Sequence, residues 1–364
     1  RTNQVGPESY GFRGNARYYD LNRDFLKMDT ENAHAFAEIF HTWLPDIFVD
    51  THTTNGADYQ YPLTLIPTRP EKLGPRTAQM IKEELSPMIY QLDNGNLVCP
   101  YVYQIGTTPD QGLKGFLDLP RYSSGYGALF QTMSFITEAH MLKPFFARVV
   151  TTAEVLRSLI SYTEKHSEEI IQAVQEDRAQ MASQKVFPIN WSLNRDSSYQ
   201  ISFKGYESVI DTSTVTGLPQ MHYDRNQPYK KDIDYFDHFK TTQTIIKPNA
   251  YLIPQAYQDV LEKLTINGVE MDTIEKDMKL SVEAYYIEGL HTYSFPYEGH
   301  YYHDSVSIRS ENQDIQFFKG DVVVYTDQWR NPYIIHALEP EAPDSWFRWN
   351  AFDGVLMQKE YFSS

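Results

Sequence analysis

The spacing of apolar residues changes near residue 185, and this change divides the sequence into two parts. In the first part, short apolar runs typical of buried strands alternate with stretches in which apolar residues recur at helical spacing. In the second part, short alternating runs are separated by Gly, Pro, Asn and Asp, which is typical of strands joined by turns. A chain of 364 residues is long enough for two domains. We therefore predict an α/β domain over residues 1–185 and a mainly β domain over residues 186–364.

Two apolar runs in the first part each lead to a polar residue of functional interest. DIFVD, at 46–50, is followed directly by THTTNG, so His52 is expected just past the end of a strand. QTMSFITEAHM, at 131–141, places Glu138 near the end of another buried strand. Because ligands of layered α/β folds bind beyond the carboxyl ends of strands, we expect both side chains at one site.

Apolar residues at helical spacing predict three helices in the first part and one in the second. The first helix follows Asp29 or Thr30, either of which can cap it, and ends before Pro45. The other three are expected at residues 75–92, 151–184 and 254–264.

The composition argues against a nucleic-acid partner, a disulfide, a cysteine-based metal site and a transmembrane segment. The net charge of −16 repels phosphate backbones, so a nucleic acid is not expected as a partner. A single cysteine, Cys99, excludes an intrachain disulfide and a cysteine-based zinc site, which leaves His and carboxylates as metal ligands. No run approaches the roughly 20 apolar residues that cross a bilayer, so no transmembrane segment is predicted.

The residue types of the first part suit a metal-dependent hydrolase. Such an enzyme needs a ligand for a Lewis acid, a base for the attacking water, and cations for the oxyanion and the substrate charge. His52 can supply an imidazole nitrogen, and Glu138 can accept a proton from water. Arg1, Arg13 and Arg23 are candidate anion binders.

Four segments resemble the zinc carboxypeptidases, in particular a bacterial branch with an extended C-terminal region. They are DLNRDF at 20–25, VDTHTTNGADYQY at 49–61, RYSSGYGALFQTMSFITEAHMLKPF at 121–145, and LEPEAPDSWFRWNAFDGVLMQKEYFS at 338–363. The resemblance implies a three-layer α/β/α mixed sheet of carboxypeptidase type, N-terminally incomplete, followed by the mainly β domain. It also implies a metallopeptidase that cleaves peptide bonds near a free C-terminus.

The resemblance implies catalytic roles for three residues. His52 matches a zinc ligand of the family. Glu138 matches the general base that activates the zinc-bound water and then protonates the leaving amine. Arg1 matches the arginine that polarises the scissile carbonyl, although its distance from the DLNR segment is longer than in the family.

Four further residues match the groups that hold the substrate. Asn22 and Arg23 match the pair that binds the terminal carboxylate, for which a planar guanidinium is well shaped. Tyr126, or alternatively Tyr122, matches the mobile tyrosine that covers bound substrate. The expected partner is therefore a peptide or amide with a free carboxylate, while the specificity for its side chains stays open.

One part of the family pattern has no counterpart. The family takes its first two zinc ligands from an HxxE motif upstream of the arginine, so Zn²⁺ would need ligands from a segment before Arg1. Because Arg1 is not a natural start, we expect that such an upstream portion existed. The HxxE strings formed by His166 with Glu169, and by His336 with Glu339, lie in the wrong order for this site.

Two other functions stay open from the sequence. The missing motif favours a non-catalytic, carboxylate- or peptide-binding pseudoenzyme, whereas retention of both His52 and Glu138 favours hydrolysis. Related folds also carry out amidase chemistry on cell-wall peptides or N-acyl amino acids with the same zinc site. The presence of a single cysteine and the likeness to secreted relatives fit a periplasmic, cell-envelope or extracellular location. The oligomeric state is not predicted.

Overall fold

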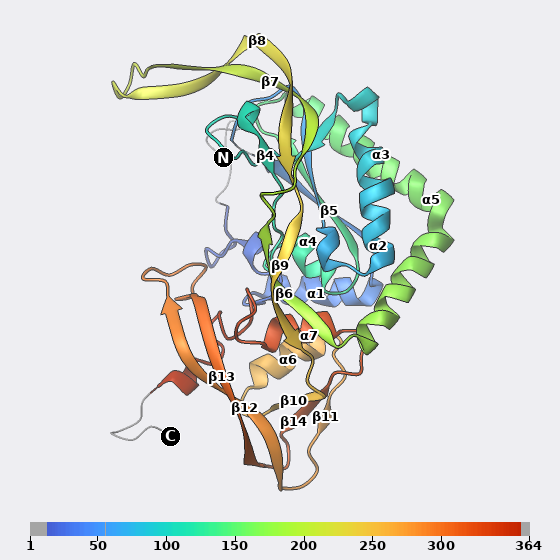
Figure 1. The fold of residues 1–364 in the computed structure, drawn as a ribbon, viewed down its shortest axis with the longest axis vertical. Helices are drawn as coiled ribbons and strands as arrows, with labels where there is room; N and C mark the ends of the chain where they lie inside the picture. The colour runs from blue at the N-terminus through green and yellow to red at the C-terminus, as the bar shows by residue number, and fades with distance from the viewer. Residues whose placement is uncertain (1–12, 55, 358–364) are drawn as a thin grey trace.

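The computed structural model describes residues 13–54 and 56–357 of the chain (Figure 1). They form a mixed α/β fold whose strands belong to several separate sheets. Within the described residues, no helix is both long and apolar enough to cross a membrane.

The central sheet carries the two polar residues that the sequence singles out. Its four strands lie in the order β1 (Ile47–Thr54), β5 (Met133–His140), β2 (Leu63–Pro67) and β3 (Val98–Pro100). β1 runs parallel to β5, whereas β2 is antiparallel to β5 and parallel to β3. The register pairs His52 on β1 with Glu138 on β5. Because side chains alternate along a strand, this pairing places both residues on the same face of the sheet.

The opposite face of the sheet packs against helices. Phe135 and Leu65 are fully buried there in one hydrophobic cluster with residues of the covering helices. These helical segments are α2 (Pro75–Met80), the π-helical turn η3 (Ile81–Leu85), α3 (Ser86–Tyr90) and α5 (Phe145–Ser183). In Figure 1 they lie together on the right of the sheet.

On the face that carries His52, the end of the sheet near the start of β1 is covered by α1 (Glu31–Trp43) and α4 (Ser123–Ala128). The rings of Phe36 and Phe40 on α1 pack against Phe48 of β1, with centroid distances of 5.7 and 6.1 Å. Of the two predicted candidates, Asp29 and Thr30, it is Thr30 that caps α1, by accepting a hydrogen bond from the Ala33 amide.

Strands dominate the second part of the chain. β6 (Val186–Leu193) pairs with β9 (Phe239–Ile246), and β12 (Met278–Thr292) pairs with β13 (His303–Phe317). Two three-stranded sheets have the orders β4 (Leu113–Lys114), β8 (Pro219–Phe236), β7 (Tyr199–Thr212), and β10 (Ala250–Ile253), β14 (Val322–Tyr325), β11 (Asp272–Thr273). The helices of this part are α6 (Gln258–Ile266) and α7 (Asn331–Leu338). Short 3₁₀ turns complete the chain: η1 (Leu21–Arg23), η2 (Pro70–Lys72), η4 (Leu92–Gly95), η5 (Pro109–Gln111) and η6 (Asp353–Leu356).

Residues from both sides of the predicted boundary share one core. Phe40 and Tyr126 from the first part pack in the same cluster as Tyr333 and Trp346 from the second. One sheet also crosses the boundary, because β4 pairs with β8. The division at residue 185 coincides with the end of α5, and whether the parts fold independently stays a prediction.

Several element boundaries differ from those predicted. His52 lies within β1, which continues to Thr54, and not just past the strand. α5 begins at Phe145, six residues before the predicted start at residue 151. The second part contains two helices, whereas the sequence pattern predicted a single one at 254–264. The additional helix, α7, was not predicted because nearly all of its residues are buried, so it lacks the polar face that marks a surface helix.

Candidate functional site

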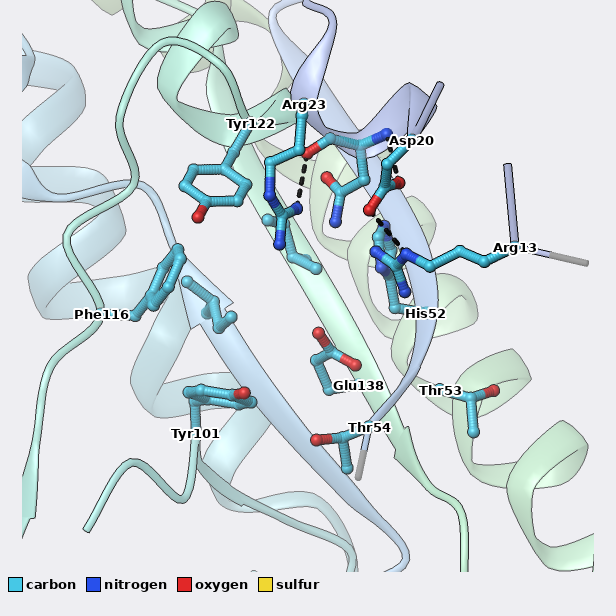
Figure 2. A pocket seen from close by; sticks show the side chains of 13 residues that line it. Arg13, Asp20, Arg23, His52, Thr53, Thr54, Tyr101, Phe116, Tyr122 and Glu138 are labelled. Carbon is cyan, nitrogen blue, oxygen red and sulfur yellow. Dashed lines mark hydrogen bonds and ion pairs between the residues drawn. The ribbon is translucent and has the colours of Figure 1, made fainter. Parts of the chain in front are cut away.

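A cavity of about 450 Å³ opens at the carboxyl ends of β1 and β5 (Figure 2). Its lining contains most of the polar residues singled out from the sequence: Asn22, Arg23, His52, Glu138 and Tyr122. Arg13, Asp20, Tyr101 and Phe116 line it as well. In Figure 2 the carboxyl group of Glu138 points into the space between His52 and Arg23.

His52 is oriented by a carboxylate on its own strand. Its Nε2 lies 2.8 Å from Asp50 Oδ2, and residues two apart on a strand share a face. Burial opposes protonation of the imidazole, but the hydrogen bond and charge of Asp50, with the charge of Glu138, raise the pKa of His52 above its usual value. Since Nε2 faces Asp50, Nδ1 is the ring nitrogen left for a ligand.

Asp50 is a site residue that the sequence analysis does not identify. Burial works to raise its pKa, but the hydrogen bond from His52 lowers the pKa of this carboxyl below its usual range. The signal that could have identified it is the DTH spacing, because an Asp two residues before a strand His lies on the same face.

Glu138 is a carboxyl group with a strongly perturbed pKa. Burial raises the pKa of Glu138 to about 7, with help from the charge of Asp50 and against the opposing charges of His52 and Arg13. A buried carboxylate often has a purely structural role as the partner of an arginine. Within the described residues, Glu138 forms no such ion pair. A carboxyl group with this pKa can both accept and donate a proton near neutral pH.

Arg23 is a cation without a carboxylate partner in the described part of the chain. Its Nη1 donates to the carbonyl oxygen of Asn22 at 2.7 Å, and its Nε donates to the hydroxyl of Tyr297 at 3.1 Å. The guanidinium lies 4.7 Å from the ring centroid of Tyr122. The two nearby aspartates are engaged elsewhere, Asp20 with Arg13 and Asp24 with Lys27.

Asn22 adds an amide to the same wall of the cavity. It lies beside Arg23 on η1, and the preceding Asp20 caps this turn by accepting a hydrogen bond from the Asn22 amide. Its side-chain Oδ1 is buried and lacks a hydrogen-bond partner among the described residues. An amide oxygen cannot bind an anion, so the groups of this pair that can donate to one are the Arg23 guanidinium and the Asn22 Nδ2.

Arg13 supplies a second cation to the cavity. Its Nε forms an ion pair of 2.6 Å with Asp20, and its charge acts on both His52 and Glu138. Arg1, to which the resemblance assigned the carbonyl-polarising role, lies outside the described residues. Among the three arginines considered as anion binders, Arg13 and Arg23 line the cavity.

Tyr126, the first choice for the tyrosine that covers bound substrate, does not line the cavity. α4 directs its ring into the core, where it is fully buried between Phe40 and Phe130. The Tyr126 hydroxyl donates to Asn267 Oδ1 at 2.5 Å, away from the cavity. The alternative, Tyr122, immediately precedes α4 and lines the cavity.

The two HxxE strings do not reach the cavity. His166 and Glu169 are joined on the surface of α5 by a hydrogen bond of 3.0 Å. His336 is buried on α7, where burial lowers its pKa to about 3, and Glu339 accepts a hydrogen bond from Tyr251. Residues 13–54 and 56–357 contain no group of three His, Cys, Asp or Glu side chains that could hold a metal ion.

Comparisons with known proteins return no matching family model, no matching curated protein and no matching solved structure.

Proposed function

We propose that the protein is a metallocarboxypeptidase-like hydrolase that cleaves a peptide or amide bond next to a free carboxylate. The observation that carries this proposal is that Arg23, His52 and Glu138 line one cavity, with His52 held by Asp50 from its own strand. An anion receptor beside a proton acceptor is the combination that hydrolysis next to a carboxylate requires.

The groups at the site suggest a division of labour. Arg23 and Asn22 bind the substrate carboxylate, which places the neighbouring carbonyl deeper in the cavity. Glu138 takes a proton from a water molecule while the water oxygen attacks the carbonyl carbon. Arg13 stabilises the oxyanion that develops on the carbonyl oxygen. Glu138 then passes the proton to the leaving nitrogen as the carbon–nitrogen bond breaks.

Zinc belongs to the proposal, but the described residues do not by themselves form a zinc site. Catalytic zinc sites use about three protein ligands, and this cavity offers the Nδ1 atom of His52, with Asp50 orienting the ring. The remaining ligands would have to come from outside residues 13–54 and 56–357. The helices on both faces of the central sheet support, as part of the same proposal, a three-layer arrangement of carboxypeptidase type.

Recognition of the carboxylate can be tested without turnover. We expect the protein to bind N-acetylphenylalanine more tightly than the uncharged N-acetylphenylalaninamide in isothermal titration calorimetry. Arg23→Gln should weaken binding of the acid by about 10- to 100-fold, because a charge-assisted hydrogen bond is lost, and leave binding of the amide nearly unchanged.

Arg157→Gln on α5 is the matched control, because its side chain is exposed and pairs with Glu154. It should preserve the preference for the acid. An acid preference that survives in Arg23→Gln would exclude Arg23 as the carboxylate receptor.

A further inference from the structure

The β12–β13 hairpin ends in a tight turn that packs against the start of the described chain. Tyr297 and His300 exchange backbone hydrogen bonds of 2.8 and 3.0 Å, and the two residues between them, Glu298 and Gly299, have φ angles of 49° and 83°. This is the left-handed backbone of a two-residue hairpin turn. A Cβ atom on Gly299 would lie 2.6 Å from the hydroxyl of Tyr19, so the turn is in direct contact with the residue before Asp20.

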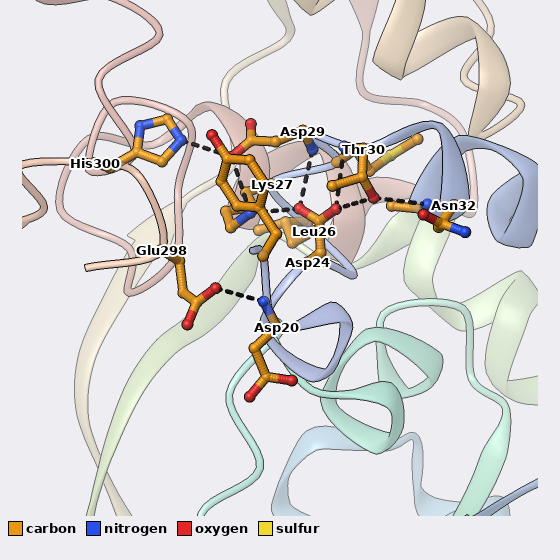
Figure 3. Close-up of polar contacts among 12 residues, drawn as sticks. Asp20, Asp24, Leu26, Lys27, Asp29, Thr30, Asn32, Glu298 and His300 are labelled. Atoms are coloured by element: carbon orange, nitrogen blue, oxygen red, sulfur yellow. Dashed lines mark hydrogen bonds and ion pairs between the residues drawn. The ribbon is translucent and has the colours of Figure 1, made fainter. Parts of the chain in front are cut away.

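Two polar contacts attach this turn to the segment that carries Asn22 and Arg23 (Figure 3). Glu298 Oε2 accepts a hydrogen bond of 2.8 Å from the amide of Asp20, just before η1. His300 Nε2 donates to Asp29 Oδ2 at 2.6 Å, just before α1. The turn therefore holds the segment at both ends, although it lies more than 260 residues away along the chain.

A third contact of the turn is with Arg23, which lines the cavity. The Tyr297 hydroxyl accepts the hydrogen bond from Arg23 Nε at 3.1 Å. Two further residues pack against the Tyr297 ring. It stacks on Trp349 with ring centroids 5.9 Å apart, and its centroid lies 5.4 Å from the guanidinium carbon of Arg121. Arg121 in turn forms an ion pair of 2.6 Å with the buried Asp344.

These contacts determine which nitrogen of the Arg23 guanidinium is left to bind a ligand. Tyr297 engages Nε and the Asn22 carbonyl engages Nη1, while Nη2 has no partner within the described residues. Tyr122 lies against one face of the group. With two of its three nitrogens held by the protein, the guanidinium meets a ligand with little rotational freedom left to lose.

We propose that Tyr297 is a positioning residue that fixes Arg23 for binding a substrate carboxylate, and that the turn at 297–300 supports it by holding residues 20–29. The assignment of a carboxylate ligand rests on the proposed function. The second part of the chain thereby contributes to substrate recognition, although Tyr297 itself does not line the cavity.

The test is a double-mutant cycle on binding of N-acetylphenylalanine and its amide. Tyr297→Phe removes one hydroxyl and should weaken binding of the acid about three- to tenfold, with little effect on the amide. In an Arg23→Gln background the same substitution should have no further effect, because Tyr297 acts through Arg23. Tyr286→Phe is the matched control on the same hairpin, where the hydroxyl accepts a hydrogen bond from Gln313.

A second readout reports on Arg23 without any ligand. In NMR spectra, the Arg23 Nε–H signal, assigned by its loss in Arg23→Gln, should be sharp in the wild type and broadened in Tyr297→Phe. An unchanged signal, or an equal loss of acid binding in both backgrounds, would overturn the positioning role. A wild-type protein without acid preference would instead refute the proposed function, and the Arg23 signal would still decide the role of Tyr297.

Discussion

Glu138 shows how a single side chain acquires its chemistry from its neighbours. Its register partner, His52, favours the ionised form, but burial and the charge of Asp50 favour the protonated form more strongly. The pKa of Glu138 therefore rises to about 7, whereas Asp50, which accepts the hydrogen bond from His52, has a lowered pKa. Near neutral pH Asp50 is therefore ionised whereas Glu138 is close to its pKa, which is the arrangement expected for an orienting anion beside a group that can exchange a proton.

This difference predicts a pH-dependent stability. Because the pKa of Glu138 is higher in the folded chain than the ordinary value of 4.5, folding is favoured by its proton at low pH, and this contribution is lost as pH rises through about 7. The stability of Glu138→Gln relative to that of the wild type should therefore increase by about 2–3 kcal/mol when the pH is raised from 5 to 8. Urea unfolding of the metal-free proteins at both pH values measures this change.

Glu154→Gln on the exposed surface of α5 is the control and should follow the wild type at both pH values. A difference between wild type and Glu138→Gln that is the same at pH 5 and pH 8 would contradict the raised pKa.

At the scale of elements, strongly periodic segments could be predicted and irregular ones could not. α1 begins at Glu31 behind its Thr30 cap, because apolar spacing and capping chemistry agree there. α7 has no polar face, so its sequence cannot be distinguished from a buried strand. β1 extends past His52 because the β-branched Thr residues that follow favour extended backbone.

The candidate site was predictable where it follows strands and unpredictable where it depends on packing. His52 and Glu138 follow from apolar runs, but the register that pairs them joins strands far apart in the sequence. Tyr122 and Tyr126 are four residues apart, yet Tyr122 precedes α4 and Tyr126 lies within it, so helical spacing does not relate their directions. The contribution of Tyr297 has no local signal at all, because it depends on tertiary contact with η1.

The N-terminus of α1 provides a test at this scale. Thr30 Oγ1 accepts a hydrogen bond from the Ala33 amide at 3.2 Å and donates one of 2.5 Å to the buried Asp24. Asp24 also binds Lys27, so the cap is joined to the segment that carries Arg23 (Figure 3). Thr30→Ala should lower the free energy of unfolding by about 1–2 kcal/mol, whereas Thr30→Ser should retain most of it. Urea unfolding that shows equal losses for Ala and Ser would mean that the hydroxyl is not the stabilising group.

At the scale of the whole molecule, the two parts of the chain are joined by a shared core and by the site. Tyr126 and Trp346 belong to one cluster, and Trp346 donates through its indole to the Leu26 carbonyl at 3.0 Å. The turn at 297–300 contacts the segment between η1 and α1. Independent domains would each need a core of their own, which this packing does not favour.

Calorimetry tests how far this coupling extends. A shared core predicts a single unfolding transition in differential scanning calorimetry, with equal calorimetric and van 't Hoff enthalpies. Two resolved transitions, one lost when residues 186–364 are removed, would show that the predicted boundary separates independently folding domains.

Product analysis by mass spectrometry tests the proposed hydrolysis most directly. The protein, extended by the upstream segment that would complete the proposed zinc site and supplied with zinc, is incubated with one peptide that has a free C-terminus and with the same peptide amidated at that end. The account predicts release of the single C-terminal residue from the free acid, little reaction of the amide, and a rate about 10²- to 10⁴-fold lower in Glu138→Gln. Cleavage within the peptide, equal rates in wild type and Glu138→Gln, or binding of the acid without any hydrolysis would contradict it.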